Sequence, residues 1–307
     1  MNNCDPNATF VKFADDTTIL VSGKTEEEAS LKMNNTLIKV ERWFTQNKLN
    51  LNPAKTRYMI FNKSTDIDNH LSINGINITR VWQKGQEKSF KLVGINIDEK
   101  LNWNEHIIAV GKKIASAAYG LHKTRNDLTS KNKTLIYSGL IHSHLTYGLS
   151  IWGHAKMSRL NQLLVKQKKA IRLIHNLKYR THTLPYFVKS KILQLPELID
   201  HTTLCYIQSG LHKDSPLHIQ DLWSKRTTQR TDLRSQGITL HIPVSHSRLV
   251  NESPSSNHSR VWNNQPHNKA TKEGSPGAFK HANKFDLLSE YLDDMTPEER
   301  DIALELE

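Results

Sequence analysis

Two adjacent carboxylates lie between β-prone apolar runs near the N-terminus, in the stretch Phe10-Val11-Lys12-Phe13-Ala14-Asp15-Asp16-Thr17-Thr18-Ile19-Leu20-Val21. The flanking runs predict a hairpin with Asp15 and Asp16 at or beside its turn. Neighbouring carboxylates repel each other, and a bound cation relieves that repulsion. Oxygen-only ligands suit Mg²⁺ or Mn²⁺, and two such ions can clamp the attacking and leaving oxygens of a phosphoryl transfer. The alternative is an exposed turn that merely contains two aspartates.

The composition points to a folded chain with a polyanionic partner. The 307 residues are 37% hydrophobic, and 42 Lys and Arg against 30 Asp and Glu give a net charge of +12. Such a balance favours nucleic acid or an anionic surface as partner. No apolar run approaches transmembrane length, so we expect no membrane partner. The two cysteines form no CxxC pair, which fits a reducing, intracellular compartment without separating nucleus from cytoplasm.

The positive charge is concentrated in the middle of the chain. Between Gly111 and Arg180, fourteen Lys and Arg face a single acid, Asp127, whereas nine acids face one base from Phe285 onward. The densest basic cluster consists of Lys166, Lys168, Lys169 and Arg172. We expect these four side chains to contact nucleic-acid phosphates. The alternative is an ordinary solvated basic face.

Local patterns predict a mixed first part. Thr25 and Glu28 form a capping box before apolar residues at helical spacing, which predicts a helix over residues 26–46. Residues 55–61 are expected to form a strand, Asn74-Gly75 to turn a hairpin, and residues 89–98 to form another strand segment.

From about residue 104 the apolar spacing becomes helical, which predicts a bundle. Three helices are expected. Their apolar positions are Ile107, Val110, Ile114, Ala117, Ala118 and Leu121; Leu135, Ile136, Leu140 and Ile141; and Leu160, Leu163, Leu164, Ala170, Ile171 and Ile174. The His142/His144 pair and the His201/Cys205 pair are interpreted as structural, since further metal ligands are not evident.

The stretch Phe13-Ala14-Asp15-Asp16-Thr17 resembles the Tyr/Phe-Ala-Asp-Asp box of reverse transcriptases. The sequence that follows it resembles the non-LTR (LINE-like, jockey/CR1-like) branch of retrotransposon reverse transcriptases. In that family the box is a hairpin of the polymerase palm whose aspartates bind the catalytic metals. The resemblance therefore implies that Asp15 and Asp16 are catalytic ligands of Mg²⁺ or Mn²⁺. It extends from Phe10 to about Tyr291.

Two further blocks carry the resemblance. Residues 49–56 resemble the block after the palm helix, and Lys55 stands where the family lysine is proposed to protonate the departing pyrophosphate. A solvated lysine at the start of a strand is an equal alternative. Leu92-Val93-Gly94 resembles the primer-grip block, although Val93 replaces the usual leucine. Gly94 would permit close approach of a primer backbone.

The resulting prediction is an α+β protein. A partial palm of antiparallel strands with a packed helix is expected over residues 1–103, a helical thumb-like bundle over 104–210, and an irregular extension with an acidic tail over 211–307. The partners implied by the resemblance are an RNA template, a DNA primer and deoxynucleoside triphosphates.

The family's first metal-binding aspartate, its fingers and its template grip would precede Met1. We therefore expect a C-terminal fragment of an RNA-directed DNA polymerase that is inactive by itself. A non-catalytic nucleic-acid-binding remnant is the main alternative, and a purely structural remnant is a third.

Overall fold

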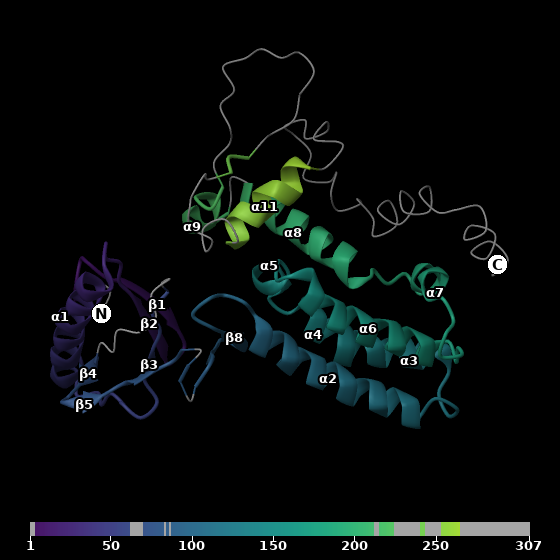
Figure 1. Cartoon of the computed structure of the whole chain (residues 1–307), viewed down its shortest axis with the longest axis horizontal. Coiled ribbons are helices and arrows are strands. Elements are labelled where there is room, and N and C mark those ends of the chain that lie inside the picture. The colour runs from purple at the N-terminus through teal and green to yellow at the C-terminus, as the bar shows by residue number, and fades with distance from the viewer. Residues whose placement is uncertain are drawn as a thin grey trace, which may run out of the picture. The chain divides into compact units, whose positions relative to one another are not determined.

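The computed structural model describes residues 4–61, 70–82, 84–85, 87–211, 215–223, 240–242 and 253–264. The chain divides into two compact units, Met1–His106 and Ile107–Glu307 (Figure 1). The first combines a long helix with short strands, and the second is helical. Mixed helix and small sheets agree with the predicted α+β class.

The predicted hairpin around the paired aspartates is confirmed. Strand β1 (Thr9–Phe13) pairs antiparallel with β2 (Asp16–Leu20), and Phe13 lies opposite Asp16. The turn therefore consists of Ala14 and Asp15 alone. Ala14 adopts a φ of 51°, which is the left-handed region that two-residue hairpin turns require at their first position.

Helix α1 (Glu26–Gln46) has the predicted bounds. The Thr25 hydroxyl accepts a hydrogen bond from the Glu28 amide at 3.2 Å, while the Glu28 carboxylate reaches back to the Lys24 amide at 2.8 Å. Two otherwise unpaired amides at the helix start are thereby satisfied. The helix carries three glutamates in its first turn, which complement its positive end.

The strand predicted over residues 55–61 was wrong in extent. Only β3 (Arg57–Tyr58) forms, and it pairs in parallel with β6 (Thr79–Arg80). The Thr56 amide donates to the carbonyl groups of Asn52 and Pro53, both at 3.2 Å, so the preceding residues form a turn instead. The Asn-Gly hairpin is confirmed between β4 (Ser72–Ile73) and β5 (Ile76–Asn77).

The single strand segment predicted over residues 89–98 is instead another tight hairpin. Strands β7 (Phe90–Leu92) and β8 (Ile95–Ile97) pair antiparallel across Val93-Gly94. Both turn residues have positive φ, 45° and 83°. Glycine favours this conformation. Val93 is β-prone, so the alternating apolar pattern predicted one continuous strand and did not indicate the turn.

The core of the first unit lies beneath α1. Leu37 of the helix packs with Leu71, Ile73 and Ile78, and Ile19 of the carboxylate hairpin packs against the same cluster. Tyr58 and Met33 complete its edge. Through Ile19 the hairpin is attached to this core, whereas Phe13 on its opposite face is 62% exposed.

The chain is mainly helical in its described residues after position 103, as predicted for residues 104–210. Its elements are α2 (Asn104–Lys123), α3 (Ser130–Tyr137), a π-helical stretch η1 (Ser138–His142), α4 (Ser143–Thr146), α5 (Leu149–Trp152), α6 (Met157–Ile174), α7 (Leu184–Lys189), α8 (Leu195–Leu211), α9 (Leu217–Gln220) and α11 (Pro254–Asn263). Helix α6 packs against α3 and α8.

The second predicted helix was right in part: Ile141 is buried and Ile136 is half-buried, but the other two predicted core positions are exposed. Leu135 and Leu140 are 65% and 52% exposed, whereas the buried positions recur every four residues. They are Lys133, Tyr137, Ile141 and Leu145. A spacing of four drifts around an α-helix of 3.6 residues per turn, and the wider π turn takes up that drift.

Part of the predicted C-terminal extension packs onto the helical unit. Helix α11 lies against α8 and α5 (Figure 1), and its Trp262 joins Leu204, Ile207, Trp223 and Leu240 in one buried cluster. The predicted acidic tail after residue 285 lies outside the described residues. No helix within the described ranges is long and apolar enough to cross a membrane.

Candidate functional site

The paired aspartates lie at the tip of the first hairpin. Asp15 is a turn residue and Asp16 is the first residue of β2, and both side chains are exposed. Exposure keeps both carboxylates hydrated and available to a cation from solution. Within the described parts of the chain, no group of three or more His, Cys, Asp or Glu side chains gathers as a metal site.

A buried carboxylate anchors the chain just before this hairpin. Asp5 accepts hydrogen bonds from the Asn7 amide at 3.0 Å and from the Thr36 hydroxyl of α1 at 2.8 Å, and it forms an ion pair with Lys39 at 3.1 Å. These hydrogen bonds, with the nearby Lys39, hold the pKa of Asp5 below its usual range. Asp5 thus ties the approach to β1 onto α1, a role that the sequence analysis missed.

The other predicted residues of the first unit occupy turns. Lys55 is exposed and lies in the turn before β3, where its amide donates to the Asn52 carbonyl at 3.1 Å. Val93 and Gly94 form the tip of the β7–β8 hairpin, and Leu92 ends β7. The structure therefore places Asp15, Lys55 and Val93 on separate surface turns of the same unit.

The segment after β8 is organised by a second buried carboxylate. Asp98 accepts hydrogen bonds from the amides of Lys100 and Asn102, both at 3.1 Å, and from that of Trp103 at 2.9 Å. Leu101 and Trp103 both have positive φ, so these contacts stabilise an unusual backbone path. An aspartate just before a turn is the sequence signal that could have identified this role.

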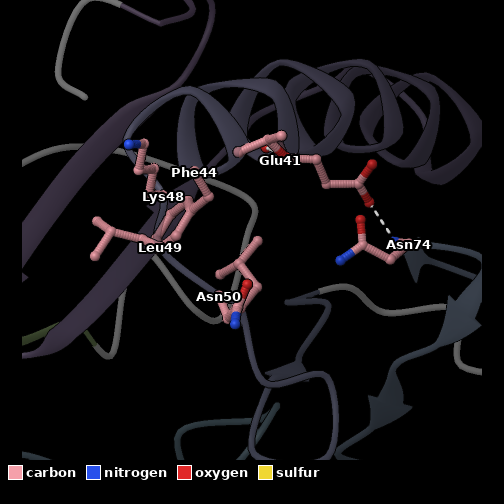
Figure 2. Close-up of a pocket in the computed structure, with 8 residues that line it drawn as sticks. Glu41, Phe44, Lys48, Leu49, Asn50 and Asn74 are labelled. Carbon is pink, nitrogen blue, oxygen red and sulfur yellow. Dashed lines mark hydrogen bonds between the residues drawn. The ribbon is translucent and has the colours of Figure 1, made fainter.

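A cavity of about 370 Å³ opens at the end of α1. Figure 2 shows Phe44 and Leu49 on one side and Glu41 facing Asn74. The backbone amide of Asn74 donates to the Glu41 carboxylate at 2.5 Å. None of the predicted site residues lines this cavity. The cavity and the aspartate hairpin are therefore separate surface features of the first unit.

The predicted basic cluster lies on α6, but its members face different surroundings. Lys169 is exposed, while Lys166, Lys168 and Arg172 are half-buried. The stem of Lys166 passes over Gly111 of α2, where an added Cβ would lie 3.2 Å from the lysine Cε. The Arg172 guanidinium donates from Nε to the Thr181 carbonyl at 3.1 Å.

The four basic residues therefore combine surface and structural environments, rather than forming one uniformly solvated row. Lys166 lies along the flank that meets α2, and Arg172 is engaged at the end of α6. Lys169 is exposed on α6, whereas Lys168 is half-buried between the buried Gln167 and Ile171 of the same helix. Of the four, Lys169 has the exposed environment that favours phosphate contacts.

Known polymerases resemble this chain over most of its length. It is 26% identical to the RNA-directed DNA polymerase from mobile element jockey of Drosophila melanogaster, over 69% of this chain and 23% of that protein. It is 25% identical to the probable RNA-directed DNA polymerase from transposon BS of the same species, over 74% and 22%.

The probable RNA-directed DNA polymerase from transposon X-element is 22% identical over 53% of this chain and 18% of its own length. The chain thus spans less than a quarter of the length of these curated relatives. No protein-family model matches it, and no solved structure matches it significantly. The resemblance drawn from the sequence is confirmed: the homologues of this chain are RNA-directed DNA polymerases of non-LTR retrotransposons.

Proposed function

We propose that this chain is part of an RNA-directed DNA polymerase of a non-LTR retrotransposon, with residues 1–103 contributing to the palm and 104–210 to a thumb-like region. One observation carries the proposal. Two adjacent, exposed carboxylates, one in the turn and one at the start of the second strand, lie at the tip of a β-hairpin in a chain whose homologues are such polymerases. The proposal assigns no chemical role to residues 211–307.

The aspartate hairpin is the proposed metal-binding element. Asp15 and Asp16 offer hard oxygen donors next to each other, which fits Mg²⁺ or Mn²⁺. Asp15 and Asp16 would hold a divalent ion there, which would supply charge stabilisation to a phosphoryl group in transfer. With no group of three candidate ligands in the described residues, the pair provides one part of a coordination sphere.

The turns of the first unit supply the remaining proposed roles. Lys55 is free in solvent at its turn and would donate a proton to the departing pyrophosphate of a deoxynucleoside triphosphate. Leu92, Val93 and Gly94 would approach the primer backbone, and Gly94 has no side chain to obstruct that approach. In this assignment each residue acts from a hairpin or turn of the first unit.

The helical unit is proposed to hold the RNA template and DNA primer through their phosphates. Lys169 supplies exposed charge, and Lys166, Lys168 and Arg172 are half-buried cations of the same helix. Phosphate contacts position a nucleic acid without reading its sequence. A non-catalytic nucleic-acid-binding remnant is the second candidate, because phosphate binding by these basic residues does not require a complete metal site.

Salt-dependent binding tests the shared part of both candidates. If about five phosphates are contacted, log K should fall with log salt at a slope near −4 on duplex and less steeply on single strands. Replacing Lys166, Lys168, Lys169 and Arg172 by Gln should weaken binding and flatten the slope. The control replaces Lys24, Lys48, Lys88 and Lys100, which are exposed in the first unit and change the net charge equally.

Equal losses in the two fourfold variants would contradict a specific role for α6. Primer extension then addresses the catalytic candidate. Primer extension requires metal ligands that are fixed on both sides of the reacting phosphate. Because Asp15 and Asp16 provide only part of such a site, we expect this chain alone not to extend a primed RNA template. Extension that Asp15→Asn abolishes would show that the chain contains a complete site.

A further inference from the structure

Helix α6 ends in a tightly fixed turn. Asn176 adopts a φ of 55°, in the left-handed region. The Leu177 amide donates back to the Arg172 carbonyl at 2.9 Å, which is the hydrogen bond of a C-terminal helix cap that contains one left-handed residue. The Thr181 amide then donates to the Lys178 carbonyl at 3.1 Å, which defines a β-turn with Tyr179 and Arg180 at its centre.

Arg172 holds this turn from both ends. Its backbone carbonyl accepts from Leu177 before the turn, and its side-chain Nε donates to the Thr181 carbonyl after it, at 3.1 Å. The guanidinium is thus engaged within the protein. Arg172 is better described as a residue that positions the turn than as an unencumbered phosphate ligand.

Helix α3 supports the same end of α6. Lys133, only 1% exposed, donates from Nζ to the Asn176 side-chain oxygen at 2.9 Å, and the Ser130 hydroxyl donates to the Ile174 carbonyl at 3.3 Å. Burial lowers the pKa of Lys133, with a smaller contribution from Arg125. The base of the turn is consequently fixed to two helices.

The tip of the turn has the opposite character, because its side chains are presented to solvent. Tyr179 is 86% exposed, and Lys178 and Arg180 on either side of it are exposed as well. Neither cation forms an ion pair within the described residues. An aromatic ring that packs against so little of its own protein contributes little to stability through burial.

An exposed ring between two cations on a rigid support matches the chemistry of an unpaired nucleotide. Aromatic side chains stack on bases of any identity, and neighbouring Lys or Arg neutralise the adjoining phosphates. Bases in a duplex are already stacked on each other and leave no free face. From this geometry, and resting on the proposed nucleic-acid-binding function, we infer that Tyr179 stacks on an unpaired base of single-stranded RNA or DNA, with Lys178 and Arg180 on its phosphates.

The test compares Tyr179→Ala, Tyr179→Phe and Tyr119→Ala in the full chain. Tyr119 is a matched control, since it is 61% exposed in the same unit but has Lys123 Nζ 5.5 Å from its ring centroid. Probes are a single-stranded RNA, a single-stranded DNA of the same sequence and the corresponding duplex. Tyr179→Ala should weaken both single-stranded complexes about tenfold, whereas Tyr179→Phe and Tyr119→Ala should stay near wild type.

A second readout reports stacking itself. A 2-aminopurine base in either single strand should lose fluorescence on binding the wild-type chain and the Phe variant, and keep it with Tyr179→Ala. Unchanged single-strand affinity in Tyr179→Ala, or an equal loss on duplex, would each overturn base stacking while leaving the proposed function intact. Absence of binding by the wild-type chain to all three probes would contradict both.

Discussion

The side-chain amide of Gln167 on α6 donates a hydrogen bond of 2.9 Å to the hydroxyl of Tyr137 on α3. Both side chains are buried. Gln167 also donates to the Leu193 carbonyl at 3.0 Å and accepts from the Leu195 amide at 2.9 Å. This one residue therefore joins α6, α3 and the start of α8 through satisfied polar contacts.

Replacing Gln167 by Leu should destabilise the helical unit by about 2–4 kcal/mol, because three buried polar partners would lose their hydrogen bonds. The free energy of unfolding in urea measures the loss. Gln162→Leu on the exposed side of the same helix is the control and should change stability by less than about 0.5 kcal/mol. Similar effects of the two substitutions would contradict the buried network.

Stability should also depend on pH through His154. Burial, and secondarily the neighbouring His258, lower the pKa of His154 to about 4, and their rings lie 5.0 Å apart. The folded state favours the neutral imidazole, so its full contribution is present above about pH 6.5 and is lost as pH falls toward 4. The maximum loss is about 3 kcal/mol.

The pH dependence is measured by urea unfolding of the wild type, His154→Gln and His182→Gln. His182 is exposed and serves as the matched control. His154→Gln should reduce the change in unfolding free energy between pH 7 and pH 4.5, and His182→Gln should not. An unchanged profile in His154→Gln would exclude His154 as its source.

The turns at Asn74-Gly75 and Val93-Gly94 offer a reciprocal test of backbone strain. Val93 holds a φ of 45° before Gly94, whereas Asn74 holds 52° before Gly75. Asparagine tolerates this region better than a β-branched residue. Val93→Asn should stabilise the first unit by about 1 kcal/mol and Asn74→Val should destabilise it similarly, by urea unfolding. Changes of the same sign would contradict the assigned turn geometry.

Local signals explain what could be predicted from the sequence. The bounds of α1 follow from Thr25, Glu28 and the apolar spacing, and the Asn74-Gly75 turn follows from a strong hairpin dipeptide. The hairpin at Asp15 was predictable because apolar runs flank it. These features depend on residues within a few positions of one another.

Long-range contacts and irregular backbone explain what could not. Leu135 and Leu140 are exposed on a helical segment that includes a π turn, and an α-helical period does not anticipate such a turn. The contact between Arg172 and Thr181 diverts a cation from the surface to the backbone. For the candidate site, Asp15 and Asp16 lie where predicted, whereas their spatial relation to Lys55 and Val93 depends on tertiary packing that no local pattern encodes.

The anchoring of the aspartate hairpin is testable through Asp5. Asp5→Asn should weaken the contact to Lys39 and leave an amide donor against Thr36, which destabilises the attachment of β1 to α1. Amide hydrogen exchange across β1 and β2 should accelerate several-fold, while exchange within α6 stays unchanged. Unaltered protection of the hairpin would mean that Ile19 and the core alone fix its position.

Selective metal binding at the hairpin is the central claim, and paramagnetic broadening by Mn²⁺ tests it most directly. Titrating the full chain with Mn²⁺ should first broaden the backbone resonances of Ala14, Asp15, Asp16 and their strand neighbours. Asp15→Asn combined with Asp16→Asn should abolish that effect, whereas Glu27→Gln, an exposed carboxylate on α1, should not. Broadening spread evenly over the acidic residues of the wild type, or unchanged in the double variant, would contradict the assignment of Asp15 and Asp16 as metal ligands.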